Sequence, residues 1–281
     1  MRSPGSTVIR WARAIRATAL ASIGSLALAA GFASARDRGA DGHFEKRESS
    51  HFVLYQDVDI DESGGLRGSR RFEQQVLAEL EVAHERLDAL LGLRPPRRIE
   101  VFVYDAALFD ARFGGLFRFE VAGFFNGAIH VRGATQLTVK LGRVLHHELV
   151  HAAFQAAAPA LVLPAWFNEG VAEWFEARVL SKRHLSANEI RYLTRARSGG
   201  AWLGLDMLSQ PNFARLPTGA AGLAYLQSYG MIEHLVRVHG ERALREVCRD
   251  VVRYHDVERS LRRSVRQGVH ELEADFQAEI S

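Results

Sequence analysis

Two histidines and a glutamate lie close together near the middle of the chain, in the run His147-Glu148-Leu149-Val150-His151. On a helix, residues four apart share a face, so His147 and His151 can direct two imidazoles at one Zn²⁺ ion while Glu148 points towards the water that the metal binds. A second run supplies a carboxylate for a third ligand, Asn168-Glu169-Gly170-Val171-Ala172-Glu173. Three protein ligands leave a fourth position for water, which is typical of a catalytic zinc site rather than a structural one.

The residues around the two runs favour a pair of helices that position these side chains. Residues 143–154 contain no Gly or Pro, and they have an apolar face formed by Val144, Leu145, Leu149 and Ala152. Pro159 follows the expected end of this helix, and Pro164 suits the first turn of the next. A short connection favours antiparallel neighbours, a geometry that returns Glu169 to the histidines. The alternative is a buried, hydrogen-bonded histidine pair in an ordinary helix.

The remaining pattern predicts an α+β fold. A small mixed α/β lobe is expected over residues 51–140 and a mainly helical lobe over 141–281, with a cleft between them. In the first lobe, apolar runs predict strands over 51–56 and 99–104 on either side of a helix over 70–91. In the second lobe, helices are expected over residues 165–180, 188–197, 222–239, 241–254 and 257–280.

A hairpin is expected just before the histidine run, because the pair Asn126-Gly127 is flanked by apolar residues. Its second strand is predicted to lie at the edge of the sheet, beside the cleft. We expect this strand to bind an extended substrate through backbone hydrogen bonds, at Ala128, Ile129 and His130. A hairpin with a purely structural role is the alternative.

The first 35 residues have the pattern of a signal peptide. Four arginines and no acidic residue precede a mostly apolar stretch over residues 17–30, and Ala33-Ser34-Ala35 is a small-residue cleavage site. The apolar stretch is shorter than the ~20 residues of a membrane span. We therefore expect export to the periplasm or the medium, followed by a flexible mature N-terminus over residues 36–50. An uncleaved segment that tethers the protein to a membrane is the alternative.

Charge and cysteine content narrow the range of functions. The whole chain has 36 Lys and Arg against 33 Asp and Glu; without the four arginines of the first 35 residues there are 32 against 33, a net charge of −1. The basic excess that would favour a nucleic-acid partner therefore belongs to the targeting segment. Cys248 is the only cysteine, so no internal disulfide can form, and we expect it to pack as a small apolar side chain in a helix.

Three stretches together resemble the peptidase MA-like family, a branch of the gluzincin zinc metallopeptidases. They are the run His147 to His151, the segment Leu163-Pro164-Ala165-Trp166-Phe167-Asn168-Glu169-Gly170-Val171-Ala172-Glu173-Trp174-Phe175-Glu176, and Tyr225-Leu226-Gln227-Ser228-Tyr229. The Asn-Glu-Gly-x-Ala segment is also similar to that of the aminopeptidase-N family. The resemblance covers roughly residues 51–280 and is specific over residues 143–176.

This resemblance implies one Zn²⁺ ion held by His147, His151 and Glu169, with Glu148 as general base. Seventeen residues separate His151 from Glu169, one fewer than in the aminopeptidase pattern, so a rotated second helix would make Glu173 the ligand instead. Otherwise Glu173 is expected to orient a metal-bound imidazole. Glu176 is interpreted as a solvated surface charge.

Tyr225 resembles the tyrosine that stabilises the oxyanion in the aminopeptidase-N family, and Tyr229 competes for this role. The expected reaction is hydrolysis of a peptide or protein substrate by a metal-activated water. Endopeptidase and aminopeptidase action both stay open, and so does the oligomeric state. The alternative function is an envelope binding module that keeps the zincin fold without cutting.

Overall fold

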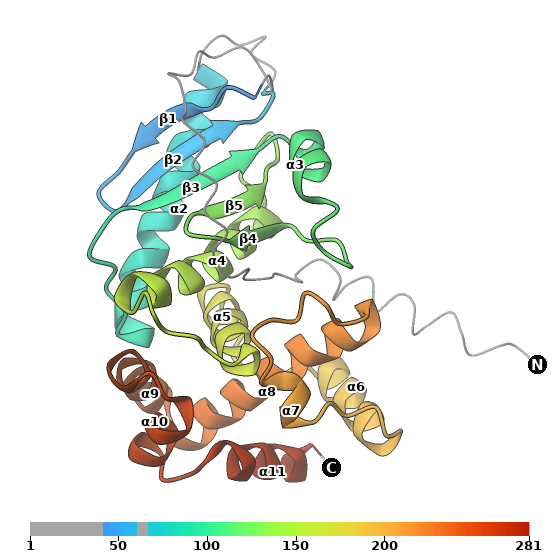
Figure 1. Cartoon of the computed structure of the whole chain (residues 1–281). Coiled ribbons are helices and arrows are strands. Elements are labelled where there is room, and N and C mark those ends of the chain that lie inside the picture. The colour runs from blue at the N-terminus through green and yellow to red at the C-terminus, as the bar shows by residue number, and fades with distance from the viewer. Residues whose placement is uncertain (1–41, 61–66, 281) are drawn as a thin grey trace, which may run out of the picture.

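The structure is a computed structural model that describes residues 42–60 and 67–280. Its N-terminal part is a five-stranded mixed sheet in the order β1-β2-β3-β5-β4 (Figure 1). The strands are β1 (Glu45–Glu48), β2 (Phe52–Asp57), β3 (Ile99–Tyr104), β4 (Gly123–Phe125) and β5 (Ile129–Arg132). Strands β2, β3 and β5 are parallel, and β1 and β4 are antiparallel at the two edges. Helix α2 (Arg67–Leu91) provides the crossover that the parallel pair β2 and β3 requires.

The two faces of the sheet bury different side chains, because successive residues of a strand point to opposite faces. Aliphatic residues of the three parallel strands, together with Phe52, belong to the main core, which also includes α2 and α4 (Val139–Ala157). The opposite face is aromatic and is joined by α3 (Ala106–Phe113). Across this face four rings stack from strand to strand, with centroids 4.6, 5.1 and 4.9 Å apart: Tyr55, Phe102, His130 and Phe124.

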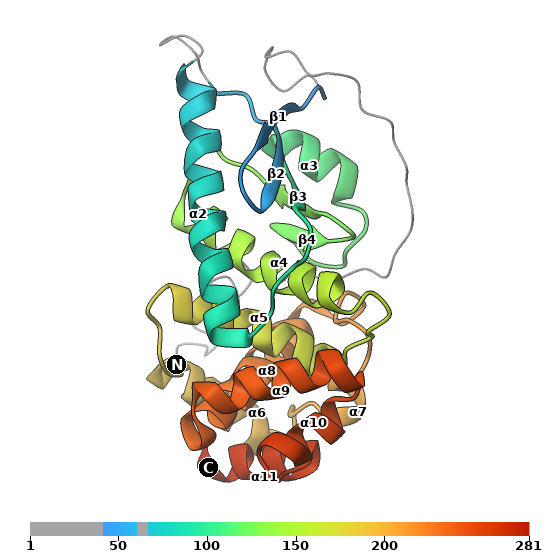
Figure 2. The ribbon, with the colours of Figure 1, turned by 90° about the vertical axis from the view of Figure 1, so that its left-hand side faces the viewer.

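The C-terminal part is helical and packs beneath the sheet, with α4 and α5 between the two (Figure 2). The helices are α5 (Ala165–Val179), α6 (Ala187–Ser198), α7 (Leu205–Leu208), α8 (Thr218–His239), α9 (Glu241–Tyr254), α10 (Val257–Ser264) and α11 (Val269–Glu279). Helix α5 packs mainly against α8, and α4 packs against α5 on one side and against α2, β4 and β5 on the others. Helix α4 therefore joins the sheet to the helical part.

The predicted α+β fold is confirmed, with a small sheet followed by a mainly helical region. The strand at 99–104 has the predicted bounds, and the hairpin turns at Gly127, which has a φ of +78°. Two predictions are wrong. Residues 45–48 of the expected flexible N-terminus form β1, which pairs with β2, and the helix expected over 257–280 is divided into α10 and α11 at Arg266, which has a φ of +61°.

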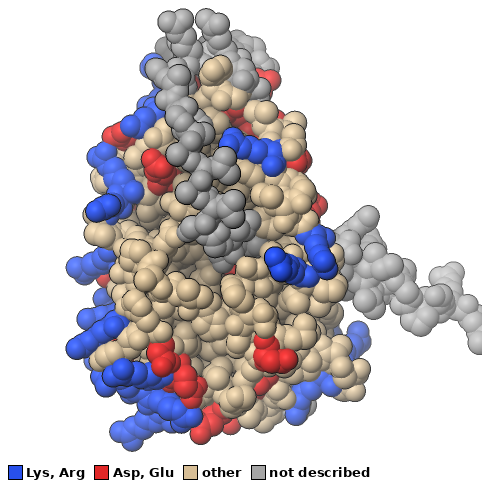
Figure 3. Space-filling view, in the orientation of Figure 1, with Lys and Arg blue, Asp and Glu red and all other residues tan. Residues whose placement is uncertain are grey.

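The predicted signal segment lies outside the described residues. Among the helices of the described part, none is long and apolar enough to cross a membrane. On the face in Figure 3, Lys and Arg side chains gather towards the lower margin over α9 and α10, with acidic side chains among them. The middle of this face is largely uncharged.

Candidate metal centre

Helix α4 presents three chemically active side chains from its buried middle. It begins after Thr138, whose hydroxyl accepts a hydrogen bond from the backbone N–H of Leu141, and this cap satisfies one of the free donors of the first turn. Its apolar residues pack between the sheet and α5. His147 and Glu148 are fully buried, and His151 is 3% exposed. The helix spans both sides of the predicted motif, as the sequence pattern indicates.

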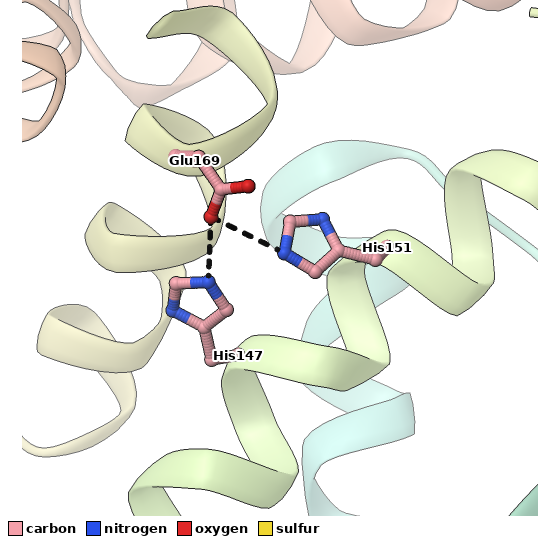
Figure 4. A group of neighbouring side chains, drawn as sticks. All are labelled: His147, His151 and Glu169. Atoms are coloured by element: carbon pink, nitrogen blue, oxygen red, sulfur yellow. Dashed lines mark hydrogen bonds and ion pairs between the residues drawn. The ribbon is translucent and has the colours of Figure 1, made fainter. Parts of the chain in front are cut away.

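Helix α5 brings Glu169 to the two imidazoles (Figure 4). Glu169 Oε2 lies 3.2 Å from His147 Nε2 and 3.5 Å from His151 Nε2, and its side chain is fully buried. These three side chains can hold a metal ion, since each offers a ligand atom within 4.8 Å of the others. Glu173 lies on the other side of His147, 3.8 Å from Nδ1. The geometry therefore gathers Glu169, rather than Glu173, with both histidines.

The hydrogen bonding of His151 fits a cation at this point. His151 Nδ1 donates to the side-chain oxygen of Asn168, 3.0 Å away, so a neutral imidazole carries its free lone pair on Nε2. Nε2 faces the Glu169 carboxylate and has no hydrogen-bond partner among the described residues. Two electron-pair donors that face each other repel unless a cation lies between them. Asn168 was missed in the sequence, although it directly precedes Glu169.

Glu148 adds a buried carboxylate beside this group. Neither of its oxygens has a hydrogen-bond partner within the described part of the chain. Burial raises the pKa of Glu148 to about 7, although the neighbouring histidines act in the opposite direction. Burial also raises the pKa of Glu169, but His151 and His147 outweigh it and lower the pKa below its usual value. A buried carboxylate without a partner is costly, and a divalent cation close by would offset that cost.

The prediction for Glu176 is wrong. This residue is not a solvated surface charge: its side chain is 2% exposed and accepts a hydrogen bond of 2.5 Å from Nε of Arg143. Its other oxygen lies 3.6 Å from His147 Nδ1. Glu173 and Glu176 therefore both lie on the Nδ1 side of His147, away from Glu169. Burial and the nearby Glu176 raise the pKa of Glu173 to about 8.

The two tyrosines of α8 have different surroundings. Tyr225 is buried, and its ring meets Phe213 edge to face at 5.3 Å. Tyr229 lies one turn further on, beneath Lys182, whose ammonium is 4.5 Å from the ring centroid. Burial, with the carboxylates of Glu189 and Glu233, raises the pKa of Tyr229. The environment of Tyr229 thus keeps its hydroxyl protonated.

The predicted edge strand is wrong. Strand β5 is paired on both sides: Ile129 lies opposite Val101 of β3 and Phe125 of β4. His130 points into the aromatic face, where its Nδ1 is 2.8 Å from the hydroxyl of Tyr104. Ala128, Ile129 and His130 therefore cannot add a substrate strand to the sheet. The edge on this side is β4, because the hairpin places its first strand outermost.

No protein-family model matches the chain, and no curated protein matches it. The function of the protein is therefore inferred from the geometry of the site.

Proposed function

We propose that this protein is a zinc-dependent peptidase, with one Zn²⁺ ion held by His147, His151 and Glu169. The observation that carries the proposal is the buried convergence of these three side chains beside a fourth, Glu148, that ligation does not require. Two imidazoles and one carboxylate form the donor set of catalytic zinc sites in which a fourth position is left for water. The alternative of a hydrogen-bonded histidine pair does not account for Glu148.

The chemistry follows from the position of Glu148. A zinc ion held by His147, His151 and Glu169 would lower the pKa of a water at the site and polarise the substrate carbonyl. Glu148 then accepts the proton of the attacking water and donates it to the leaving amine. Its burial at the site, next to both histidines, places this carboxylate where it can take up and release that proton. We assign stabilisation of the developing oxyanion to Tyr225, the residue that resembles the oxyanion-stabilising tyrosine of the aminopeptidase-N family.

An extended peptide substrate would pair with β4 rather than β5. The N–H of Arg132 binds the carbonyl of Ala122, and the N–H of Asn126 binds the carbonyl of Ala128. Because hydrogen-bonding residues alternate along an antiparallel pair, the backbone groups of Gly123 and Phe125 point away from β5. All three residues of β4 are buried, so this outer row is proposed only as the part of the hairpin whose backbone groups a substrate strand would pair with. Export to the periplasm or the medium stays part of the proposal, on the pattern of residues 1–35.

The test replaces Glu148 with Gln, which keeps the shape of the side chain and removes its basicity. We expect Glu148→Gln to bind one equivalent of zinc and to lose nearly all peptidase activity, measured with a peptide library whose cleaved bonds are mapped by mass spectrometry. Glu85→Gln, on the exposed face of α2, is the matched control and should cleave like the parent protein. Retained turnover in Glu148→Gln would contradict the assignment of the base. A parent protein that binds zinc and cleaves nothing would favour a binding module.

A further inference from the structure

We propose that Glu176, held by Arg143, is the carboxylate that orients His147 for metal binding. This inference rests on the proposed metal site and assigns a positioning role to two residues outside the HExxH motif and the Glu169 ligand. It also chooses between Glu173 and Glu176, which both lie on the Nδ1 side of the same imidazole.

The geometry favours Glu176 as the partner of Nδ1. Its Oε2 is 3.6 Å from this nitrogen, against 3.8 Å for Glu173 Oε1. The Glu176 side chain is 2% exposed and the Glu173 side chain 17%. Since water competes less for a buried acceptor, Glu176 has the stronger effect on the imidazole. A small rotation of either side chain would bring the 3.6 Å contact to hydrogen-bond length.

Arg143 determines the orientation of Glu176. It lies on α4, one helical turn before His147, and its Nε donates to Glu176 Oε1. With Oε1 taken by the guanidinium, Oε2 is the oxygen left to face His147. Arg143 also places a positive charge beside this buried carboxylate. Helices α4 and α5 therefore contact each other on both sides of the His147 ring. Arg143 and Glu176 form the contact on one side, and His147 and Glu169 form the contact on the other.

The consequence for His147 concerns its tautomer. An imidazole that donates its Nδ1 proton to a carboxylate presents the Nε2 lone pair to the metal and is a stronger ligand. Nε2 is the nitrogen that faces Glu169. His151 is arranged in the same way, since its Nδ1 donates to Asn168. An oxygen acceptor thus lies behind each imidazole: a Glu176 oxygen 3.6 Å from Nδ1 of His147, and the Asn168 oxygen hydrogen-bonded to Nδ1 of His151.

The experiment measures zinc affinity by competition with a chromophoric chelator, in the full-length protein. Glu176→Gln is expected to lower the affinity 10- to 100-fold, the usual effect of removing a carboxylate behind a metal-bound histidine. Glu173→Gln is the matched control, with the same change of atoms on the same face of α5, and is expected to lower it less than about threefold. The electronic spectrum of the Co²⁺-substituted protein should shift in Glu176→Gln and not in Glu173→Gln.

A double variant separates orientation from folding. Glu176→Gln leaves Arg143 without its carboxylate, whereas Arg143→Met combined with Glu176→Gln removes both charges of the pair. If Glu176 acts on His147, the double variant should bind zinc as weakly as Glu176→Gln. Recovery of parental affinity in the double variant would overturn the proposal, because the loss would then come from the unpaired arginine alone.

Two other outcomes would also overturn it. Parental zinc affinity in Glu176→Gln, with a loss in Glu173→Gln, would make Glu173 the orienting carboxylate. His147, Glu173 and Glu176 themselves form a second group that can hold a metal ion. Two zinc equivalents in the parent and one in Glu176→Gln would therefore make Glu176 a ligand. These readouts need no peptidase activity, so a metal-binding protein that cleaves nothing would overturn the proposed reaction and leave this inference standing.

Discussion

Replacing Gly170 with Ala should destabilise the protein because α8 lies directly against α5 at this glycine. A Cβ at position 170 would lie 2.5 Å from the carbonyl oxygen of Ser228 and 2.8 Å from Cγ1 of Ile232. The first contact is with backbone, which cannot rotate away. Helix α8 would have to retreat by about 1 Å to reach ordinary van der Waals distance. Glu169 precedes Gly170 directly, so the same displacement would disturb the candidate ligand.

The magnitude follows from two opposing effects. Alanine is about 1 kcal/mol more favourable than glycine in a helix interior. Overpacking of a dense core costs about 1–3 kcal/mol, and a clash between two helix backbones belongs at the upper end of this range. The expected net loss is about 2 kcal/mol in the free energy of unfolding. For a chain of this size it corresponds to a fall of about 4–8 °C in Tm.

Gly142→Ala is the matched control. Gly142 is also buried in a helix, α4, but a Cβ there would meet only Oε1 of Glu79, at 3.8 Å. This variant should gain up to about 1 kcal/mol, because the helix-propensity effect acts without a clash. Urea unfolding followed by circular dichroism measures both variants against the parent. A Gly170→Ala variant as stable as the parent, or stabilised like Gly142→Ala, would refute the argument from close helix packing.

Two further predictions concern groups away from the site. Burial lowers the pKa of His130 to about 4, so its contribution to stability is complete above pH 6.5 and is lost as the pH falls towards 4, by up to about 3 kcal/mol. In urea unfolding between pH 4.5 and 7.5, the stability of the parent relative to His130→Phe should therefore decrease with falling pH, and a constant difference would contradict it. Cys248 is fully buried on α9, and burial raises the pKa of its thiol. The Cys248 thiol should resist a thiol reagent in the native protein and react with it in urea. Rapid labelling of the native protein would contradict the burial of this side chain.

The sequence predicts those elements whose signals are local. The strand at 99–104 is a short run of mainly β-branched and aromatic residues, and α2 has helical periodicity that ends at Gly92. Strand β1 has the sequence Glu-Lys-Arg-Glu, which contains no apolar alternation, and it exists because β2 offers an edge to pair with. The break between α10 and α11 depends on a positive φ at Arg266, a residue type that gives no warning of it.

The wrong predictions at the site also arise from contacts between residues that are far apart in the sequence. Asn126-Gly127 predicts the hairpin, but sequence does not show which of its strands faces β3, and that choice decides which strand is the edge. Glu176 was misjudged because an acidic residue on a helix usually faces water. Arg143, which forms an ion pair with the buried Glu176, is 33 residues away in the chain. Long-range pairing of charges is therefore what local pattern fails to predict here.

The connection between the two helices of the site helps to set the position of Glu169. Helix α4 ends at Ala157 and α5 begins at Ala165. The start of α5 is held from outside the motif, because the N–H of Ala165 binds the carbonyl of Gln210 and the Trp166 side chain is buried. This anchored first turn holds α5 in the orientation in which Glu169 faces both histidines, while Glu173 lies one turn further on, beside Nδ1 of His147.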